Sequence, residues 1–294
     1  MNYYNQIKEE LINNEIYKKV KDYSKNRSDL NAYYNVGKLL YEAGKHYGEG
    51  IIKNYSKKLT TELNKGYSTT NLKYMRQFYL FCKKSHALRD QLTWTHYREL
   101  IFIDDINKIE YYIKVSIEQN LSYRQLHEKI KNKEYERLDE EAKYKLIKQE
   151  EPQINDFIKN PIILRNSYNY INITEKILKQ LILEQLNNFM KEIGEGFSYI
   201  DHEYKIKLGD RYNYIDLLLY NIKYNCYVVI ELKVSELKKE HIGQIQIYMN
   251  YIDKHMKTIN QNNTIGIIVC AKDNKIILEY CSDPRVYETS FVLN

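Results

Sequence analysis

Residues 212–234, YNYIDLLLYNIKYNCYVVIELKV, decide the fold of the second half of this chain. The stretch holds two short runs, YNYIDLLLY and YNCYVVIEL, that are rich in β-branched and aromatic residues. Between them stands NIKYN, whose composition is typical of a turn. Runs of this length and composition, bounded by turn residues, predict two neighbouring β-strands joined by a short connection.

Three charged residues lie in or next to these apolar runs: Asp216 in the first, Glu231 in the second and Lys233 directly after the second. Alternate residues of a strand face the same side, so Glu231 and Lys233 should project together. A hairpin can bring the Asp216 carboxylate beside Glu231. A charge in an apolar strand is costly unless it is paired, and two adjacent carboxylates repel each other.

A divalent cation would relieve both costs at this cluster. Carboxylate oxygens with retained waters are typical ligands of Mg²⁺, and such an ion can lower the pKa of a bound water. Lys233 could position that water or stabilise charge in a transition state. The alternative is a purely structural salt-bridged cluster of Asp216, Glu231 and Lys233, and the spacing alone favours this alternative.

The sequence on either side of residues 212–234 predicts an α/β sandwich with a mixed sheet. Helical spacing precedes it, with Gly194 as a stop, and helical spacing also follows it. The remaining runs read as strands. The predicted order is helix 173–194, strands 197–208, 212–220 and 224–232, helix 237–257, and strands 264–271 and 275–280.

The first half of the chain has a different pattern, with helical apolar spacing and no long alternating run. Pro152 and Pro161 flank a short segment after it, so we place the domain boundary at about 150–165. The expected domains are a helical domain, 1–155, and an α/β domain, 165–294. Residues 1–160 hold 29 Lys and Arg against 23 Asp and Glu, whereas the rest holds 16 of each. The basic half suits a polyanion-binding module, although a lysine-rich composition alone decides nothing.

The stretch KGYSTTNLKYMRQFY, residues 65–79, predicts a helix-turn-helix in the first half. Gly66 can end one helix, and Ser68 or Thr69 can cap the next. The second helix would face the core with Leu72, Met75 and Tyr79. An ordinary helical hairpin with a polar exterior is an equally good interpretation. The residues expected to face a nucleic acid are Thr70, Asn71, Lys73, Arg76 and Gln77.

The motif D-(x)14-E-x-K on adjacent strands resembles the PD-(D/E)XK nuclease superfamily. Gln244 and Tyr248 also match its Q-x-x-x-Y element. More specifically, residues 194–254 followed by IGIIVCA resemble the nuclease domain of YhcG-like bacterial proteins. In the first half, YYNVGKLL, KGYSTTNLKYMRQFYLF, LTWTHYRELI and QNLSYRQLHEKI resemble that family's N-terminal helical domain. The resemblance covers roughly residues 30–281.

This resemblance implies a restriction-endonuclease-like fold with a divalent metal, Mg²⁺ or Mn²⁺. It makes Asp216 and Glu231 metal ligands, Lys233 the catalytic lysine, and Gln244 an accessory residue of the active site. Glu184 is a candidate for an extra acid on the first helix, although a solvated helix charge is its more ordinary interpretation. Ile215 stands where the family's motif has proline, which leaves the aspartate ligand in place.

We therefore expect an α+β two-domain, Mg²⁺-dependent endodeoxyribonuclease whose helical domain recognises DNA or a partner. Action on RNA stays open because nothing in the sequence reads a 2′-hydroxyl. The alternative is a catalytically silent nucleic-acid-binding or assembly protein that retains the nuclease fold. The chain has no apolar run of about 18 residues and no secretory signal, so a cytoplasmic location away from membranes is expected. A homo-oligomer is left open.

Overall fold

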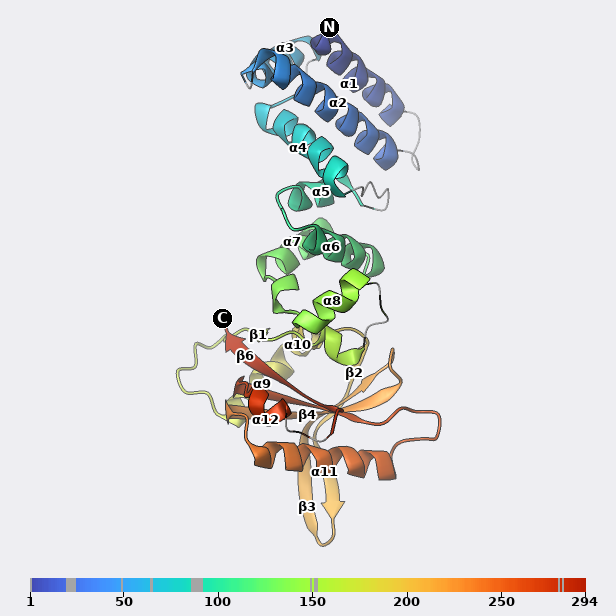
Figure 1. Cartoon of the computed structure of the whole chain (residues 1–294). Helices are drawn as coiled ribbons and strands as arrows, with labels where there is room; N and C mark the ends of the chain where they lie inside the picture. The colour runs from blue at the N-terminus through green and yellow to red at the C-terminus, as the bar shows by residue number, and fades with distance from the viewer. Residues whose placement is uncertain are drawn as a thin grey trace. The chain divides into compact units, whose positions relative to one another are not determined.

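The computed structural model describes residues 2–19, 25–48, 50–63, 66–85, 92–148, 150, 153–279, 281 and 283–294 (Figure 1). The chain divides into two compact units, residues 1–135 and 136–294. This division falls before the boundary expected at about 150–165, and Pro152 lies outside the described residues. Each unit is described by itself below.

In its described residues, unit 1 is built from α-helices, which confirms the expected all-helical first half. Gly37 explains how tightly α2 and α4 pack, because a Cβ there would lie 2.1 Å from the Met75 backbone oxygen. Among the helices that the structure describes in either unit, none combines the length and apolarity needed to cross a bilayer. The helices are α1 (Tyr3–Lys19), α2 (Lys25–Tyr47), α3 (Ile51–Leu63), α4 (Thr69–Ser85), α5 (Trp94–Leu100), α6 (Ile106–Glu118) and α7 (Tyr123–Lys131).

Unit 2 is built on a six-stranded mixed sheet in the order β1-β6-β5-β4-β3-β2. The strands β2, β3 and β4 pair antiparallel, whereas β4, β5, β6 and β1 pair parallel. The mixed sheet confirms the expected fold class. The strands are β1 (Ile162–Leu164), β2 (Phe197–Leu208), β3 (Arg211–Asn221), β4 (Cys226–Glu236), β5 (Ile265–Lys272) and β6 (Val286–Leu293).

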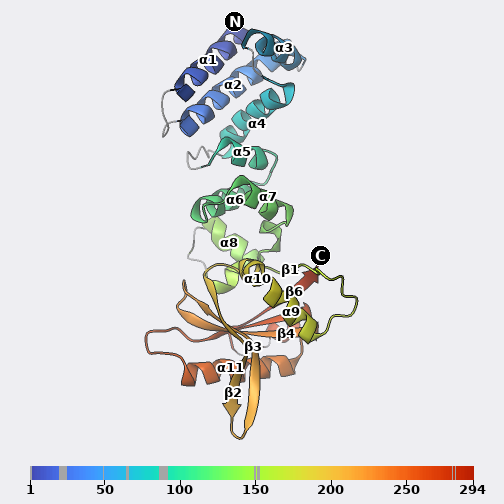
Figure 2. The ribbon, with the colours of Figure 1, turned by 180° about the vertical axis from the view of Figure 1, so that it is seen from behind.

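Helices cover both faces of this sheet, and the alternation of apolar residues explains why (Figure 2). On β4, Val228 and Ile230 pack in a cluster with α9 (Glu175–Glu184) and α10 (Leu186–Ile193). Val229 packs in the opposite cluster with α11 (Lys239–His255). Gly266 of β5 lets α11 approach, because a Cβ there would lie 2.6 Å from the Met249 sulfur.

The predicted helix 173–194 is two helices in the structure. The break is at Gln185, which has φ −121° and ψ 31° and whose side-chain amide donates to the Arg165 carbonyl at 2.7 Å. The chain leaves α10 at Gly194, whose φ is 132°. The hydrogen bond from Gln185 to the Arg165 carbonyl holds Gln185 out of helical geometry. The spacing of apolar residues cannot reveal such a contact.

The predicted strand KIILEY, 275–280, is wrong, because Lys275–Glu279 form the short helix α12. Asn274 begins this helix by accepting a hydrogen bond from the Ile277 backbone N–H at 3.3 Å. A short apolar run does not distinguish a strand from a helix, so the cap decides here. The last strand is β6, which lies beyond the predicted run and pairs parallel with β5.

The segment 136–161 belongs to unit 2 because polar contacts tie it to the sheet and its helices. Arg137 forms an ion pair with Glu192 of α10, and Thr289 of β6 donates to the Lys159 carbonyl at 2.6 Å. Within the segment, Lys145 of α8 (Glu140–Lys148) binds Asp156 at 3.1 Å. These contacts explain why the division between the units comes earlier than the prolines suggest.

Candidate active site

Strands β3 and β4 bring the Asp216 and Glu231 carboxylates together, as the hairpin pattern predicts. Leu217 and Ile230 form the last residue pair between the two strands, and Asp216 and Glu231 stand next to that pair, midway along β3 and β4. The Leu232 backbone N–H donates to Asp216 Oδ2 at 2.9 Å, which fixes the aspartate against β4. This hydrogen bond orients the Asp216 carboxylate.

Glu231 is a buried carboxylate with an incomplete set of partners. Its side chain is 4% exposed. Lys233 Nζ donates to Oε1 at 2.8 Å, but Oε2 is buried and has no hydrogen-bond partner among the described residues. Burial and the nearby Asp216 charge raise the pKa of Glu231 to about 7, although Lys233 opposes this effect. A buried carboxylate oxygen without a partner is costly and needs an explanation.

Lys179 of α9 is a site residue that sequence reasoning missed. Its ammonium group lies 2.9 Å from Asp216 Oδ1 and 3.0 Å from Glu203 Oε1. Burial alone would lower the pKa of Lys179, but its hydrogen bonds to Asp216 and Glu203 outweigh burial and raise it. The available signal was its spacing, because Glu175 and Lys179 are four residues apart and share one face of the helix.

The acid that α9 brings to the site is Glu175 and not Glu184. Glu175 begins the helix, and its Oε1 lies 3.9 Å from Lys233 Nζ. Glu184 ends the helix, is exposed, and accepts a hydrogen bond from Gln180 at 2.9 Å. The two ends of the helix are nine residues apart, about 13 Å, so Glu175 fits the extra-acid role better, and the role of Glu184 stays a prediction.

Helix α11 borders the same cluster with Gln244 and Tyr248. The Gln244 amide donates to the Tyr248 hydroxyl at 3.0 Å, and Tyr248 is buried. Burial raises the pKa of Tyr248, and the negative charge of Glu231 also contributes to this shift. At the start of the helix, the Lys238 backbone N–H donates to His241 Nδ1 at 3.1 Å, so His241 caps the helix.

The donor set of this cluster fits a Mg²⁺ or Mn²⁺ ion. Asp216 and Glu231 supply carboxylate oxygens, and the partnerless Glu231 Oε2 is the atom that a cation would satisfy. Within the described ranges, no three His, Cys, Asp or Glu side chains converge closely enough to form a complete metal cage. Mg²⁺ does not require one, because it keeps several waters and binds through one or two carboxylates.

The residues predicted to face nucleic acid in unit 1 lie on α4 but differ in exposure. Thr70 and Lys73 are exposed, whereas the others are half-buried: Asn71, Arg76 and Gln77. The Ser68 hydroxyl accepts a hydrogen bond from the Asn71 N–H at 3.2 Å, which is the expected helix cap. Leu72, Met75 and Tyr79 are buried as expected. Nucleic-acid binding by this helix stays a prediction.

Each of the two units matches a family model over most of its length. Residues 155–288 match the family model described as the YhcG PDDEXK nuclease domain. Residues 8–137 match the model described as the DUF1016 N-terminal domain. The resemblance stated from the motifs is therefore confirmed over most of the chain.

A curated relative and two solved structures are also similar. The chain is 25% identical over 284 residues to "Putative nuclease YhcG" of Escherichia coli (strain K12), covering 82% of this chain and 76% of that protein. A repair endonuclease from Pyrococcus abyssi is 18% identical over 42% of this chain, with a TM-score of 0.30. A complex of EndoMS with double-stranded DNA is 19% identical over 44%, with a TM-score of 0.29. The match spans 48%, about half, of each of these two chains.

Proposed function

We propose that this chain, which joins a DUF1016 N-terminal domain to a YhcG PDDEXK nuclease domain, is a metal-dependent endonuclease that hydrolyses phosphodiester bonds of DNA. One observation carries the metal dependence: Glu231 is buried beside Asp216 with one carboxylate oxygen lacking a partner. A structural carboxylate would be expected to have both oxygens satisfied.

In this proposal, each residue of the cluster has a role that its geometry allows. Asp216 and Glu231 would hold Mg²⁺ or Mn²⁺, which polarises a phosphodiester and lowers the pKa of a bound water. Hydrolysis adds the water oxygen to phosphorus and breaks the bond to the leaving sugar oxygen. The Lys233 ammonium group, whose Nζ lies 2.8 Å from Glu231 Oε1, would stabilise the negative charge that develops on the phosphoryl oxygens. Gln244, held by Tyr248, would orient the backbone of the substrate.

Lys179 balances the charge of Asp216 in this scheme. Its ammonium group neutralises Asp216, and Glu203 offers it a second carboxylate at 3.0 Å. If Asp216 held a cation, Lys179 would still have Glu203 as an ion-pair partner.

A second candidate function has one observation in its favour. Both carboxylates already have a lysine partner, Lys179 for Asp216 and Lys233 for Glu231. Such a charge-balanced cluster also suits a catalytically silent nucleic-acid-binding or assembly protein that keeps the nuclease fold. The partnerless oxygen of Glu231 favours the enzyme.

One experiment separates the two candidates. The full chain is incubated with Mg²⁺ or Mn²⁺ and supercoiled plasmid, duplex, branched and single-stranded DNA, and RNA. We expect cleavage of DNA by the wild type and by Glu184→Ala, whose side chain is exposed, but none by Asp216→Ala. Calorimetry should show that Asp216→Ala and Glu231→Ala lose Mn²⁺ binding at the site. Unchanged Mn²⁺ affinity in both variants would refute the proposal. Cleavage of RNA but not of DNA would show that the substrate is RNA.

A further inference from the structure

The outer half of the β2–β3 hairpin, residues 204–215, exposes a face on which lysines and tyrosines alternate. Lys205 pairs across the hairpin with Tyr214, and Lys207 pairs with Tyr212. We infer that this face, formed by Lys205, Lys207, Tyr212 and Tyr214, binds unpaired nucleotides of the substrate. The inference rests on the proposed nuclease function for the identity of the ligand. In Figures 1 and 2 the tip of this hairpin projects beyond α11.

The opposite face of the hairpin is anchored, which leaves this face free. Ile206 and Ile215 are 1% and 0% exposed and pack in the cluster beneath α11. Neighbouring residues of a strand point to opposite sides, so Lys205, Lys207 and Tyr214 point away from that cluster. The hairpin is therefore a supported platform whose outer side chains are not needed for the core.

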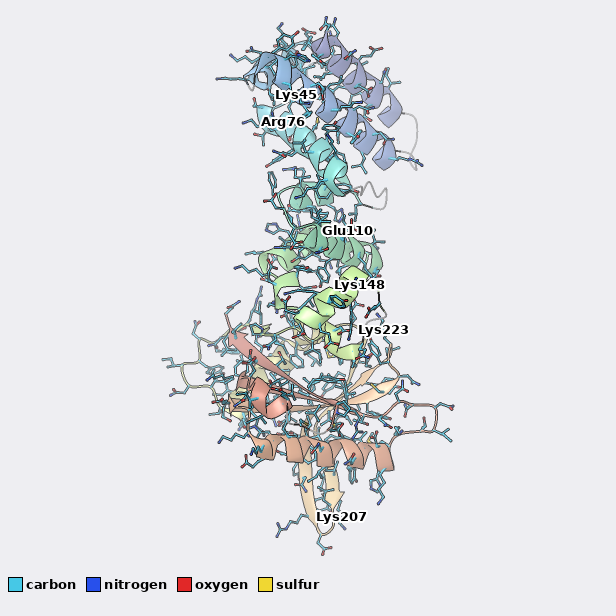
Figure 3. The ribbon with its side chains drawn as sticks, in the orientation of Figure 1. Lys45, Arg76, Glu110, Lys148, Lys207 and Lys223 are labelled. Carbon is cyan, nitrogen blue, oxygen red and sulfur yellow. The ribbon has the colours of Figure 1, made fainter. Side chains whose placement is uncertain are left out.

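The exposure of the two tyrosines is unusual for a structural role. Tyr212 is 55% exposed and Tyr214 is 53% exposed, although each could bury a large apolar ring. Lys205 Nζ lies 3.8 Å from the centre of the Tyr212 ring, so cation and ring already lie together. Figure 3 labels Lys207 at the tip.

A nucleotide in an unpaired segment matches this combination of groups. Its phosphate suits a lysine ammonium, and its base can stack on an aromatic ring, as in proteins that bind single strands. Bases within a duplex are already stacked on their neighbours, so they gain less from tyrosine rings. The alternating face thus favours single-stranded or locally unpaired nucleic acid over a closed duplex.

The position of the face leads toward the candidate active site. Tyr214 stands two residues before Asp216 on β3, about 7 Å along the strand. On β2, Lys205 stands two residues after Glu203, which binds Lys179 at the site. A strand bound along the hairpin would therefore reach the carboxylates within one or two nucleotides. This continuity argues that the ligand is the substrate and not a separate partner.

Binding of the full chain to DNA tests the inference without cleavage. Fluorescence anisotropy in EDTA compares a single-stranded oligonucleotide with the same sequence as a blunt duplex, over a salt series. The variants are Tyr212→Ala with Tyr214→Ala, Tyr212→Phe with Tyr214→Phe, and Lys205→Gln with Lys207→Gln. The matched control is Tyr144→Ala with Lys148→Gln, an exposed tyrosine–lysine pair on α8 of the same unit. Thermal melting checks that each variant is folded.

We expect the alanine pair to weaken single-strand binding by more than about tenfold, with a change below about threefold for the duplex. The phenylalanine pair keeps the rings and should bind within about twofold of the wild type. The glutamine pair should reduce the slope of log affinity against log salt by about 1.4, the value for two lost phosphate contacts on a single strand. The control pair should leave all these values unchanged.

Crosslinking locates the contact independently of affinity. A single strand carrying 5-iodouracil should crosslink to Tyr212 or Tyr214 on irradiation, as mapped by mass spectrometry. Crosslinks confined to other segments would overturn the inference, as would unchanged single-strand affinity in the alanine pair or an equal loss for the duplex. If the wild type did not cleave nucleic acid but these binding results were obtained, the nuclease proposal would be refuted. The inference that this face binds unpaired nucleotides would still hold.

Discussion

At the scale of single residues, the site is a balance between buried charges. Two carboxylates, Asp216 and Glu231, lie next to each other, and each has one lysine at 2.9 or 2.8 Å. Burying a charge is tolerated only when partners satisfy it, and Glu231 Oε2 has none among the described residues. Glu231, which is buried with an unsatisfied carboxylate oxygen, is therefore also the residue that a bound cation would stabilise.

Lys233 is the residue whose replacement separates catalysis from structure. We expect Lys233→Met to leave metal and DNA binding nearly intact and to lower the cleavage rate by about 10²–10³, the scale for losing one transition-state donor. Lys233→Arg should rescue poorly, because a broad planar guanidinium cannot copy a compact ammonium. Single-turnover cleavage and thermal melting of the three proteins provide the measurement. A large fall in melting temperature with a near-normal rate would make Lys233 a structural counter-ion.

The raised pKa of Glu231 predicts how stability depends on pH in the metal-free protein. Burial and Asp216 raise this pKa from 4.5 to about 7. The folded state then binds a proton more tightly than the unfolded state, so this contribution to stability is present below about pH 4.5 and is lost as the pH rises through 7. The shift corresponds to a loss of about 3 kcal/mol.

Glu231→Gln removes this titration and gives a direct comparison. Between pH 5 and pH 8 we expect the melting temperature of the wild type in EDTA to fall relative to that of Glu231→Gln. Adding Mn²⁺ at pH 8 should recover stability in the wild type only, because the cation needs the ionised carboxylate. Parallel curves for the two proteins across this range would contradict the assignment.

At the scale of elements, α9 and α11 reach the site from different sides of the sheet. Helix α9 carries Glu175 and Lys179 on one face, while α11 carries Gln244 and Tyr248 four residues apart. Thr174 caps α9 by accepting from the Ile177 N–H at 3.3 Å, and so fixes where Glu175 stands. The first half of α9 therefore carries Glu175 and Lys179, the two side chains of this helix that contact the site.

The two acids of α9 form a matched pair for mutation. Glu175→Gln removes a negative charge 3.9 Å from Lys233 Nζ. Because Glu175 is half exposed, its charge is worth only about 1 kcal/mol at the site, so we expect Mg²⁺ affinity to fall by about fivefold. Glu184→Gln changes the same helix by the same charge at its exposed end and should have no effect. The Mg²⁺ affinity of the two variants is measured by calorimetry and by titrating the cleavage rate with Mg²⁺. An equal fall in Mg²⁺ affinity in both variants would show that the position of the acid on the helix is irrelevant.

At the scale of the whole molecule, the two units differ in charge. Unit 1, residues 1–135, holds 24 Lys and Arg against 16 Asp and Glu, whereas residues 136–294 hold 21 against 23. The structural division thus makes the charge contrast larger than the predicted boundary did. A basic unit attracts nucleic acid at long range. Unit 2 has a small net negative charge, so any contact it makes with nucleic acid depends on individual side chains.

This contrast predicts a division of labour in binding DNA. We expect the affinity for duplex DNA to reside mostly in unit 1 and to weaken steeply as salt rises. The measurement is the salt dependence of duplex binding for the full chain and for residues 136–294, after circular dichroism has shown that the fragment is folded. A fragment that bound duplex DNA as tightly as the full chain, with the same salt slope, would place the main duplex contacts in unit 2.

The sequence by itself determined the elements whose patterns are local. The run 197–208 is β2 with the same bounds, and the D-(x)14-E-x-K spacing brought Asp216 and Glu231 together through one hairpin. Periodicity and turn residues are enough for such features, because the residues concerned are neighbours in sequence. The mixed sheet and the helical first half followed from the same patterns.

Only the tertiary structure decided which distant side chains complete the site. Lys179 and Glu175 read in the sequence as ordinary charges of an amphipathic helix, as does Glu184. Their roles depend on how α9 lies across the sheet, and that packing also depends on the break at Gln185. Apolar periodicity gives the buried face of a helix but neither its direction on the sheet nor the partner that each charge meets. The ion pairs that Lys179 and Glu175 make at this site arise from that direction, so no local pattern contains them.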